Sequence, residues 1–93
     1  MGKNIIKIKM MDLYPAGTCL RSEMENIFLE LPAYTKRVVL DFKGFNIWSL
    51  TTAQEYCHQK RLLNIPVEEV NIDLHSQRLI DISEERYQKL LKD

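Results

Sequence analysis

Few residues of this chain could do chemistry: two cysteines, two histidines and a pair of threonines that follows a short apolar run. Cys57 and His58 are adjacent, and because neighbours on a helix point about 100° apart, they cannot act together as nucleophile and base. His75 pairs with Cys57 only if the fold brings the two side chains together. We interpret Cys57 as a core residue, since free cysteine is among the most buried residue types.

Other catalytic and metal-binding signatures are missing from the sequence. Cys57 and the two histidines lack the clustered spacing of a zinc site, and the isolated glycines form no phosphate-binding loop. Asp41 follows an apolar run and is either a catalytic carboxylate or, more commonly, a strand-end residue that accepts hydrogen bonds from turn amides. Because no acid–base pair emerges, we expect no enzyme, no cofactor and no metal.

Composition indicates one compact domain that spans residues 1–93. The chain is 45% hydrophobic and 28% charged, which suits a soluble globular protein. Its 13 basic and 13 acidic residues cancel, so nothing draws it to nucleic acid or an anionic membrane. No apolar run approaches the ~20 residues of a membrane span. Two lone cysteines and no signal-peptide pattern predict reduced thiols and a cytoplasmic protein.

The elements that would position these residues follow from two hydrophobic periodicities. "NIIKIKM" alternates isoleucine with lysine, which predicts a half-exposed strand whose inward residues are Ile6, Ile8 and Met10. Ser22 and Glu25 have capping-box spacing, which predicts a helix that ends near Leu31.

The run "RVVLDF" is apolar on both sides of a strand, so we expect it to be the central parallel strand with helices over both faces of the sheet. Thr51 and Gln54 form a second capping box and predict a helix that ends at Asn64 and Pro66. Its inward face is predicted to hold Ala53, Tyr56, Cys57, Lys60 and Leu63.

The last third of the chain is less regular. "VEEVNIDL" predicts a strand with Val70, Ile72 and Leu74 inward, "HSQRLIDI" a short helix or irregular link, and Ser83 the start of a final helix. The order is β-α-β-α-β-α. It predicts an α/β fold with packed helices on a small, mostly parallel sheet of three to five strands. A fourth, short strand could lie near residues 18–20.

The loop before the predicted second capping box is unusually apolar. Four of its side chains are hydrophobic: Phe45, Ile47, Trp48 and Leu50. They either form a docking surface, where tryptophan often anchors a partner, or fold under to cap the sheet. We expect Trp48 to be the one at the surface.

The stretch "VVLDFKGFNIWSLTTAQEY" resembles the signature of the STAS superfamily, which includes bacterial anti-sigma-factor antagonists. It is most similar to STAS-like domains of unknown function, and "LRSEMENI" resembles the entry to their first helix. The resemblance covers roughly residues 5 to 75. The positions that match are Asp41, Phe42, Gly44, Ile47, Ala53 and Glu55, with Thr51 in place of a serine.

The resemblance implies a switch in which a kinase-like ATPase phosphorylates the start of the helix and then no longer binds. Only Thr51 matches the phospho-acceptor. Ser49, Leu50 and Thr52 replace the Asp, Ser and Gly of the antagonist motif. A phosphate at a helix N-terminus is compatible with the fold, and its charge would oppose docking on an apolar or acidic partner. An ordinary capping role for Thr51 is the alternative.

The sequence therefore predicts a non-catalytic, STAS-like interaction module for a protein partner. The expected partner surface is the loop and helix start, namely Trp48, Ser49, Leu50, Thr52 and Glu55, with Thr51 as the candidate phospho-acceptor. The alternative is a structural or assembly subunit without a switch, which forms a homodimer through an edge strand such as "IIKIKM".

Overall fold

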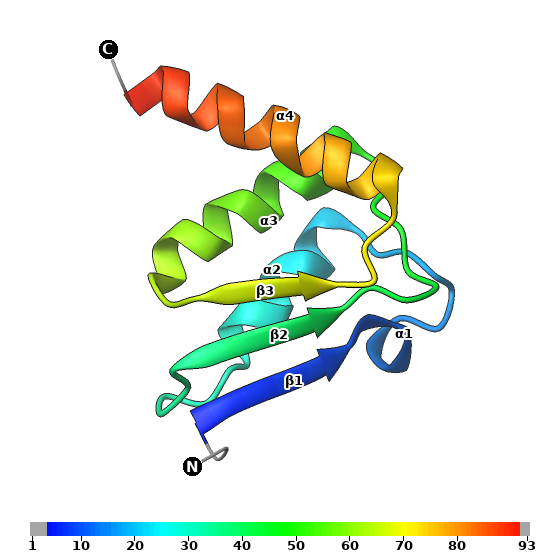
Figure 1. The fold of residues 1–93 in the computed structure, drawn as a ribbon, viewed down its shortest axis with the longest axis vertical. Helices are drawn as coiled ribbons and strands as arrows, with labels where there is room; N and C mark the ends of the chain where they lie inside the picture. Colours follow the sequence, from blue (N-terminus) through cyan, green and yellow to red (C-terminus); the bar gives the residue numbers. More distant parts are fainter. Residues whose placement is uncertain (1–3, 92–93) are drawn as a thin grey trace.

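The computed structural model describes residues 4–91 and shows an α/β fold with the element order β-α-α-β-α-β-α (Figure 1). The elements are β1 (Ile5–Lys9), α1 (Met10–Leu13), α2 (Arg21–Leu29), β2 (Arg37–Asp41), α3 (Leu50–Leu63), β3 (Val67–Val70) and α4 (Leu74–Leu91). Within these residues the sheet has three parallel strands in the order β1-β2-β3, so the predicted α/β class and the central position of β2 are confirmed.

All three long helices lie on one side of the strands, and Figure 1 looks onto the face that no described helix covers. The two β-α-β crossovers, from β1 to β2 and from β2 to β3, run in the same direction across the sheet. Right-handed crossovers that run in one direction place their helices, here α2 and α3, on the same face. The prediction of helices over both faces was therefore wrong. α3 packs between α2 and α4, and α4 extends the helical layer beyond β3.

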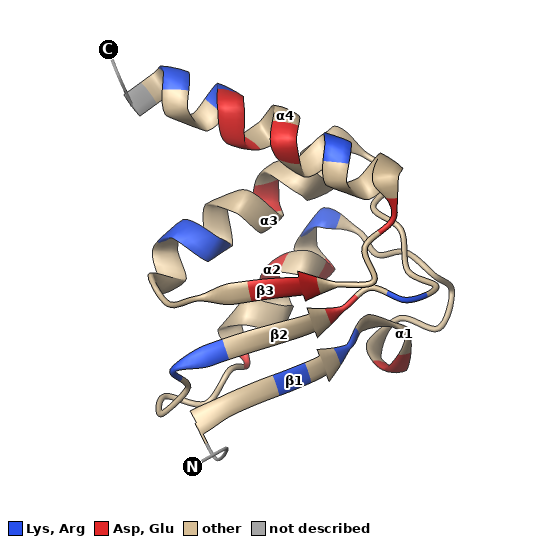
Figure 2. Ribbon diagram, viewed as in Figure 1, with Lys and Arg blue, Asp and Glu red and all other residues tan. Residues whose placement is uncertain are grey.

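The two faces of the sheet differ in polarity. Val38 and Leu40 of β2 point into the core and are fully buried. The opposite face carries charged side chains from all three strands, namely Lys7, Lys9, Arg37, Asp41 and Glu68. Figure 2 colours the lysines of β1 blue, and its red on β3 covers Glu68 together with Glu69, which faces the helices. Val39 is half-buried among these charges. β2 is the central strand, with β1 on one side and β3 on the other, and its apolar run reflects this position.

Of the residues predicted to point inward from this segment, Ile72 packs against the core, whereas Val70 and Leu74 do not. In the register, Val67 pairs with Val38 and Glu69 with Leu40, so Val67 and Glu69 face the helices and Val70 faces the open side. Leu74 is 78% exposed at the start of α4. The prediction for Val70 failed because a glutamate, Glu69, was not expected on the side of the strand that faces the helices.

On the helix side of the sheet, Glu69, whose side chain is 16% exposed, has two partners. Its carboxylate accepts a hydrogen bond from the Tyr56 hydroxyl and from Lys60 Nζ, the latter at 3.0 Å. Lys60 Nζ also lies 5.1 Å from the centre of the Tyr56 ring. Charge pairing and hydrogen bonding make a buried carboxylate tolerable. The predicted inward positions of Tyr56 and Cys57 are confirmed.

The first half of the chain departs from the predicted caps. β1 ends at Lys9, and the buried Met10 begins α1. Residues 18–20 form no strand. α2 begins at Arg21 with Leu20 as its N-cap residue, and Glu23 Oε1 accepts a hydrogen bond from the Leu20 amide at 2.8 Å. The predicted Ser22 cap is therefore wrong by two residues.

α4 is one continuous helix where a link and a later helix were expected. Asp73 precedes it, and Asp73 Oδ2 accepts a hydrogen bond from the Ser76 amide at 2.9 Å, as an N-cap does. Ser83, the predicted start, lies in mid-helix, where its hydroxyl donates to the Leu79 carbonyl at 2.9 Å. Among residues 4–91 no helix has both the length and the apolar character needed to cross a membrane.

Candidate functional site

The loop between β2 and α3 is held from both sides, so its exposed residue has a fixed position. Phe45 and Ile47 are buried. The Phe45 amide donates to the Phe42 carbonyl at 2.8 Å, and the Ile47 amide donates to Ser76 Oγ at 2.8 Å. Trp48 follows directly and is 71% exposed, which confirms the prediction that it reaches the surface.

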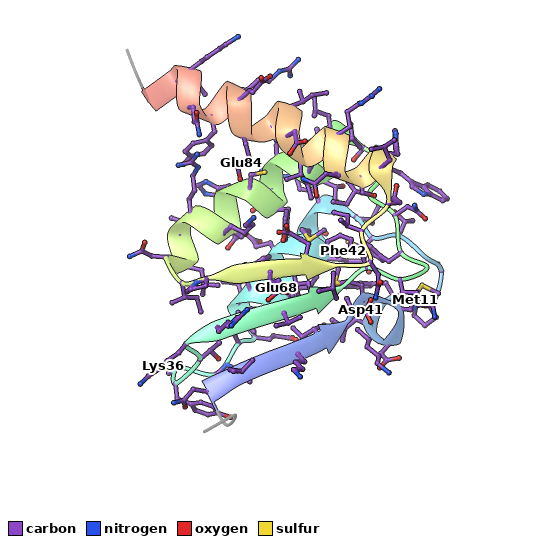
Figure 3. All side chains as sticks on the ribbon, in the orientation of Figure 1. Met11, Lys36, Asp41, Phe42, Glu68 and Glu84 are labelled. Atoms are coloured by element: carbon purple, nitrogen blue, oxygen red, sulfur yellow. The ribbon has the colours of Figure 1, made fainter. Side chains whose placement is uncertain are left out.

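Two glycines bring this loop against the connection between α1 and α2. Gly44 has φ +80°, and a Cβ there would lie 3.2 Å from Met11 Cγ. Gly17 has φ +89°, and a Cβ there would lie 3.3 Å from the Gly44 carbonyl oxygen. The Asn46 amide donates to the Gly17 carbonyl at 2.8 Å. Both connections lie near the carboxyl ends of the strands, where Figure 3 shows Met11 and Asp41.

The N-cap of α3 is Ser49, and the prediction that Thr51 caps the helix with Gln54 was wrong. α3 begins at Leu50, and Ser49 Oγ accepts a hydrogen bond from the Thr52 amide at 3.2 Å. Ser49 Oγ also donates to Thr52 Oγ1 at 2.9 Å. Thr51 lies in the first turn and is exposed, and among residues 4–91 its hydroxyl has one hydrogen-bond partner, Ser49 Oγ at 3.2 Å. Its hydroxyl is therefore not needed as the cap.

A groove of about 650 Å³ separates the starts of α2 and α3. We call it the α2–α3 groove. Leu20, which is 70% exposed, and Trp48 line it, so two large apolar side chains face solvent beside one hollow. The remaining lining residues are Thr18, Cys19, Arg21, Ser22, Glu25, Ser49, Thr51, Thr52 and Glu55.

A second hollow of about 400 Å³, the α3–α4 groove, lies on the other side of the same helix start. α4 contributes Ser83, Arg86, Tyr87 and Leu90 to its lining, and α3 contributes Gln54 and His58. Three further residues line both grooves: Arg21, Thr51 and Glu55. Thr51 thus lies where the two grooves meet.

A buried carboxylate lies between the grooves. Glu55 is 8% exposed and accepts hydrogen bonds from Gln59 Nε2 at 2.8 Å and from Arg21 Nε at 3.0 Å. The Gln59 hydrogen bond and the Arg21 guanidinium together hold the pKa of Glu55 below its usual value. The side chain of Arg21 is 70% exposed, so this pair joins a buried anion to a cation at the surface.

The predicted partner surface divides into exposed and supporting residues. Trp48, Ser49 and Thr51 are exposed, whereas Thr52 and Glu55 lie in the floor of the α2–α3 groove with little free surface. Leu50 is half-buried and is not among the residues that line this groove. The side chains available to a partner here are thus a subset of those predicted.

Cys57 has the environment of a structural thiol. It is 1% exposed, and its Sγ lies 3.7 Å from the Ile80 carbonyl oxygen. Burial, with the Glu84 carboxylate nearby, raises the pKa of the Cys57 thiol to about 12, so the nucleophilic thiolate is not populated at neutral pH. The interpretation of Cys57 as a core residue is confirmed.

Asp41 is the strand-end residue that the commoner interpretation expected. Its Oδ1 accepts hydrogen bonds from Asn71 Nδ2 and from the Lys43 amide, each at 3.0 Å. The Asn71 hydrogen bond is the main cause of a lowered pKa at Asp41. In the part of the chain that the structure describes, no three His, Cys, Asp or Glu side chains are grouped so that they could hold a metal ion.

Sequence reasoning missed Leu20, Arg21 and Arg86 as parts of this site. Leu20 had a weak local signal, an apolar residue directly before a predicted helix. Arg21 and Arg86 had none, because only the packing of α2 and α4 on α3 brings them to Thr51. Comparisons of the chain with protein-family models, with curated proteins and with solved structures found no match. Membership of the STAS superfamily therefore stays a prediction.

Proposed function

We propose that this chain is a non-catalytic module that binds a protein partner in the α2–α3 groove and is switched by phosphorylation of Thr51. One observation carries the proposal. Trp48 and Leu20 are 71% and 70% exposed on the rim of one groove. Large apolar side chains that gather beside a hollow are typical of a protein interface, and tryptophan is prominent among residues that carry binding energy.

The fixed position of Trp48 supports this proposal. The buried Phe45 and Ile47 and the backbone hydrogen bonds of the loop order the residue before any partner arrives. A preorganised backbone loses less conformational entropy on binding than a mobile one. The cytoplasmic kinase-like ATPase implied by the resemblance to anti-sigma-factor antagonists is the partner that we propose.

The position of Thr51 supports the switch. Because Ser49 caps α3, a phosphate on Thr51 leaves the cap in place. The added charge lies in the lining of the groove and opposes an apolar or acidic partner surface. The same phosphate meets the amide groups and the positive dipole end of the first turn, so the domain stays folded.

The experiment is affinity capture from the native host with the full chain and four variants. The wild type and Thr51→Ala should retain the same protein, identified by mass spectrometry, while folded Thr51→Glu and Trp48→Ala should lose it. Tyr34→Ala is the matched control, because Tyr34 is a 59% exposed aromatic residue before β2, at the other end of the sheet. If Trp48→Ala captures as well as Tyr34→Ala, the groove is not the docking site.

One observation favours the alternative, an assembly subunit without a switch. β1 is an edge strand of the described sheet, as a homodimer through this strand requires. Lys7 and Lys9 nevertheless lie exposed on it, and a two-fold antiparallel pair centred on Lys7 would place like charges opposite each other. A dimer in solution that dissociates on Ile6→Lys, with Thr51→Glu without effect on capture, would favour this alternative.

A further inference from the structure

Thr51 has basic residues from two other helices around it, although its own helix start carries none. Arg21 begins α2, and Arg86 belongs to the second half of α4. Both line the α3–α4 groove together with Thr51. Figure 2 shows the basic residue at the start of α2, and Figure 1 shows α3 between α2 and α4. Arg21 and Arg86 thus share one groove with Thr51, and Arg86 enters it from the part of α4 whose Tyr87 packs on His58.

Arg21 is already aimed at this face of α3. Its Nε lies 3.0 Å from Glu55 Oε1, and Glu55 is one helical turn after Thr51, so both side chains project on the same side. Among the hydrogen bonds of the described residues, Arg21 uses only Nε. Its two terminal nitrogens, in a side chain that is 70% exposed, can donate to an oxyanion at Thr51.

We propose that a phosphate on Thr51 is bound by Arg21 and Arg86, so that phosphorylation joins α2 and α4 across the start of α3. This inference rests on the proposed phosphorylation of Thr51. Phosphorylation forms a bond between Thr51 Oγ1 and the γ-phosphorus of ATP and breaks the bond from that phosphorus to its bridging oxygen. ADP leaves, and the hydroxyl proton passes to the base of the kinase.

The chemistry of the groove suits a dianion. Guanidinium groups donate paired N–H groups that match phosphate oxygens, and such charge-assisted hydrogen bonds are about twice as strong as neutral ones. Glu55 opposes the phosphate, yet its carboxylate keeps the Gln59 hydrogen bond at 2.8 Å. His58 completes the charged and titratable lining on α3. The bound phosphate draws Arg21 over the α2–α3 groove and so reshapes the docking surface.

The test uses the full chain with phosphothreonine at position 51, prepared by native chemical ligation of residues 1–56 as a thioester to residues 57–93, which begin with Cys57. The readout is the midpoint of the phosphate titration by phosphorus NMR. We expect the midpoint of the folded protein to lie at least about 0.5 pH unit below that of an unfolded peptide of residues 46–56, because nearby cations favour the dianion.

Four variants of the phosphorylated chain identify the groups responsible. Arg21→Gln and Arg86→Gln should each move the midpoint back toward the peptide value, and Glu55→Gln should lower it further. Arg78→Gln is the matched control, since Arg78 is an exposed arginine of α4 that lines a different hollow with Leu74 and His75. It should leave the midpoint of the wild type unchanged.

The outcomes separate this inference from the proposed function. A midpoint equal to that of the peptide, or Arg21→Gln and Arg86→Gln indistinguishable from Arg78→Gln, overturns the arginine site even if the phosphate releases the partner. A lowered midpoint that depends on both arginines supports the site even if the captured partner still binds, and in that case only the proposed switching is wrong.

Discussion

Two carboxylates that pack against α3, Glu55 at 8% exposed and Glu69 at 16% exposed, have different surroundings. Glu69 lies inside, where Tyr56 and Lys60 both donate to it and Lys60 is only 22% exposed. Glu55 is 8% exposed but pairs with Arg21, which is 70% exposed. The Glu69 cluster is closed, whereas the Glu55 cluster opens to two grooves. The difference separates a charge that has two donors on the helix side of the sheet from one that lines the grooves of the proposed docking site.

The closed cluster also explains how a glutamate can point inward from β3. The Tyr56 hydroxyl and the Lys60 ammonium both donate to Glu69 Oε2, and pairing of this kind offsets the cost of burying a charge. The open cluster also pairs its carboxylate, Glu55, with a cation, but that cation is Arg21, whose side chain is 70% exposed. Only the open cluster can exchange or add an anion without loss of a core contact.

The largest loss of stability that we expect from this comparison is at Glu69. Glu69→Ala leaves the Tyr56 hydroxyl and the Lys60 ammonium without their shared acceptor, and we expect it to lower the free energy of unfolding by about 2–3 kcal/mol. Urea unfolding measures the change. The control is Glu68→Ala, which removes an exposed pair with Arg37 on the open face and should cost less than about 1 kcal/mol. Equal losses would contradict the closed cluster.

The second prediction concerns alkaline pH. Burial, and then the Glu69 carboxylate, raises the pKa of Tyr56 well above its usual 10.0. The folded protein keeps this proton where the unfolded chain loses it. The contribution to stability is therefore complete below pH 10 and declines above it, by up to about 1.4 kcal/mol per pH unit.

Unfolding free energies between pH 9.5 and 11 check this slope. Tyr56→Phe has no proton to lose at this position, so its stability should decline less steeply over the interval than that of the wild type. Tyr34→Phe, on an exposed side chain, should follow the wild type. Parallel slopes for wild type and Tyr56→Phe would show that the hydroxyl is not enclosed.

The smallest effects are predicted at the open end of α3. Ser49→Ala removes the N-cap and should cost about 1 kcal/mol, whereas Thr51→Ala should stay within about 0.5 kcal/mol. Thermal or urea unfolding of the two variants measures both. The reverse order would make Thr51 the cap, as the sequence alone indicated, and would remove the argument that its hydroxyl is available for modification.

Periodicity in the sequence was enough to predict β1, β2, the body of α3 and its end at Asn64, because each has one apolar side or a local stop signal. The left-handed φ of 55° at Asn64 and the following Pro66 are such a signal. The loop was recognised as packed or docking because four apolar side chains are too many for a solvated loop, and Trp48 was the one expected at the surface.

The failures have physical causes in long-range contacts. Glu69 was placed outward because its partners, Tyr56 and Lys60, come from another element. The first half of α4 was missed because its cap, Asp73, was not considered, and its buried Ser76 is satisfied by the loop amide of Ile47. Such contacts cannot be inferred from a single sequence before the packing of the elements is known.

The site was predicted in part for the same reason. The loop and helix start were found because they are contiguous in the chain. Arg21 is 34 residues from Glu55, and no local pattern connects the two. The groove and its charge therefore depend on helix packing, whereas the candidate phospho-acceptor Thr51 and the exposed Trp48 can be recognised in the sequence.

We propose that the start of α3 is a docking site controlled by Thr51. The most direct test is the affinity of the captured partner for the ligated full chain with and without phosphate on Thr51, measured by calorimetry. We expect the phosphate to weaken binding at least about tenfold, a change of 1.4 kcal/mol. Equal affinity of the two folded forms would contradict it.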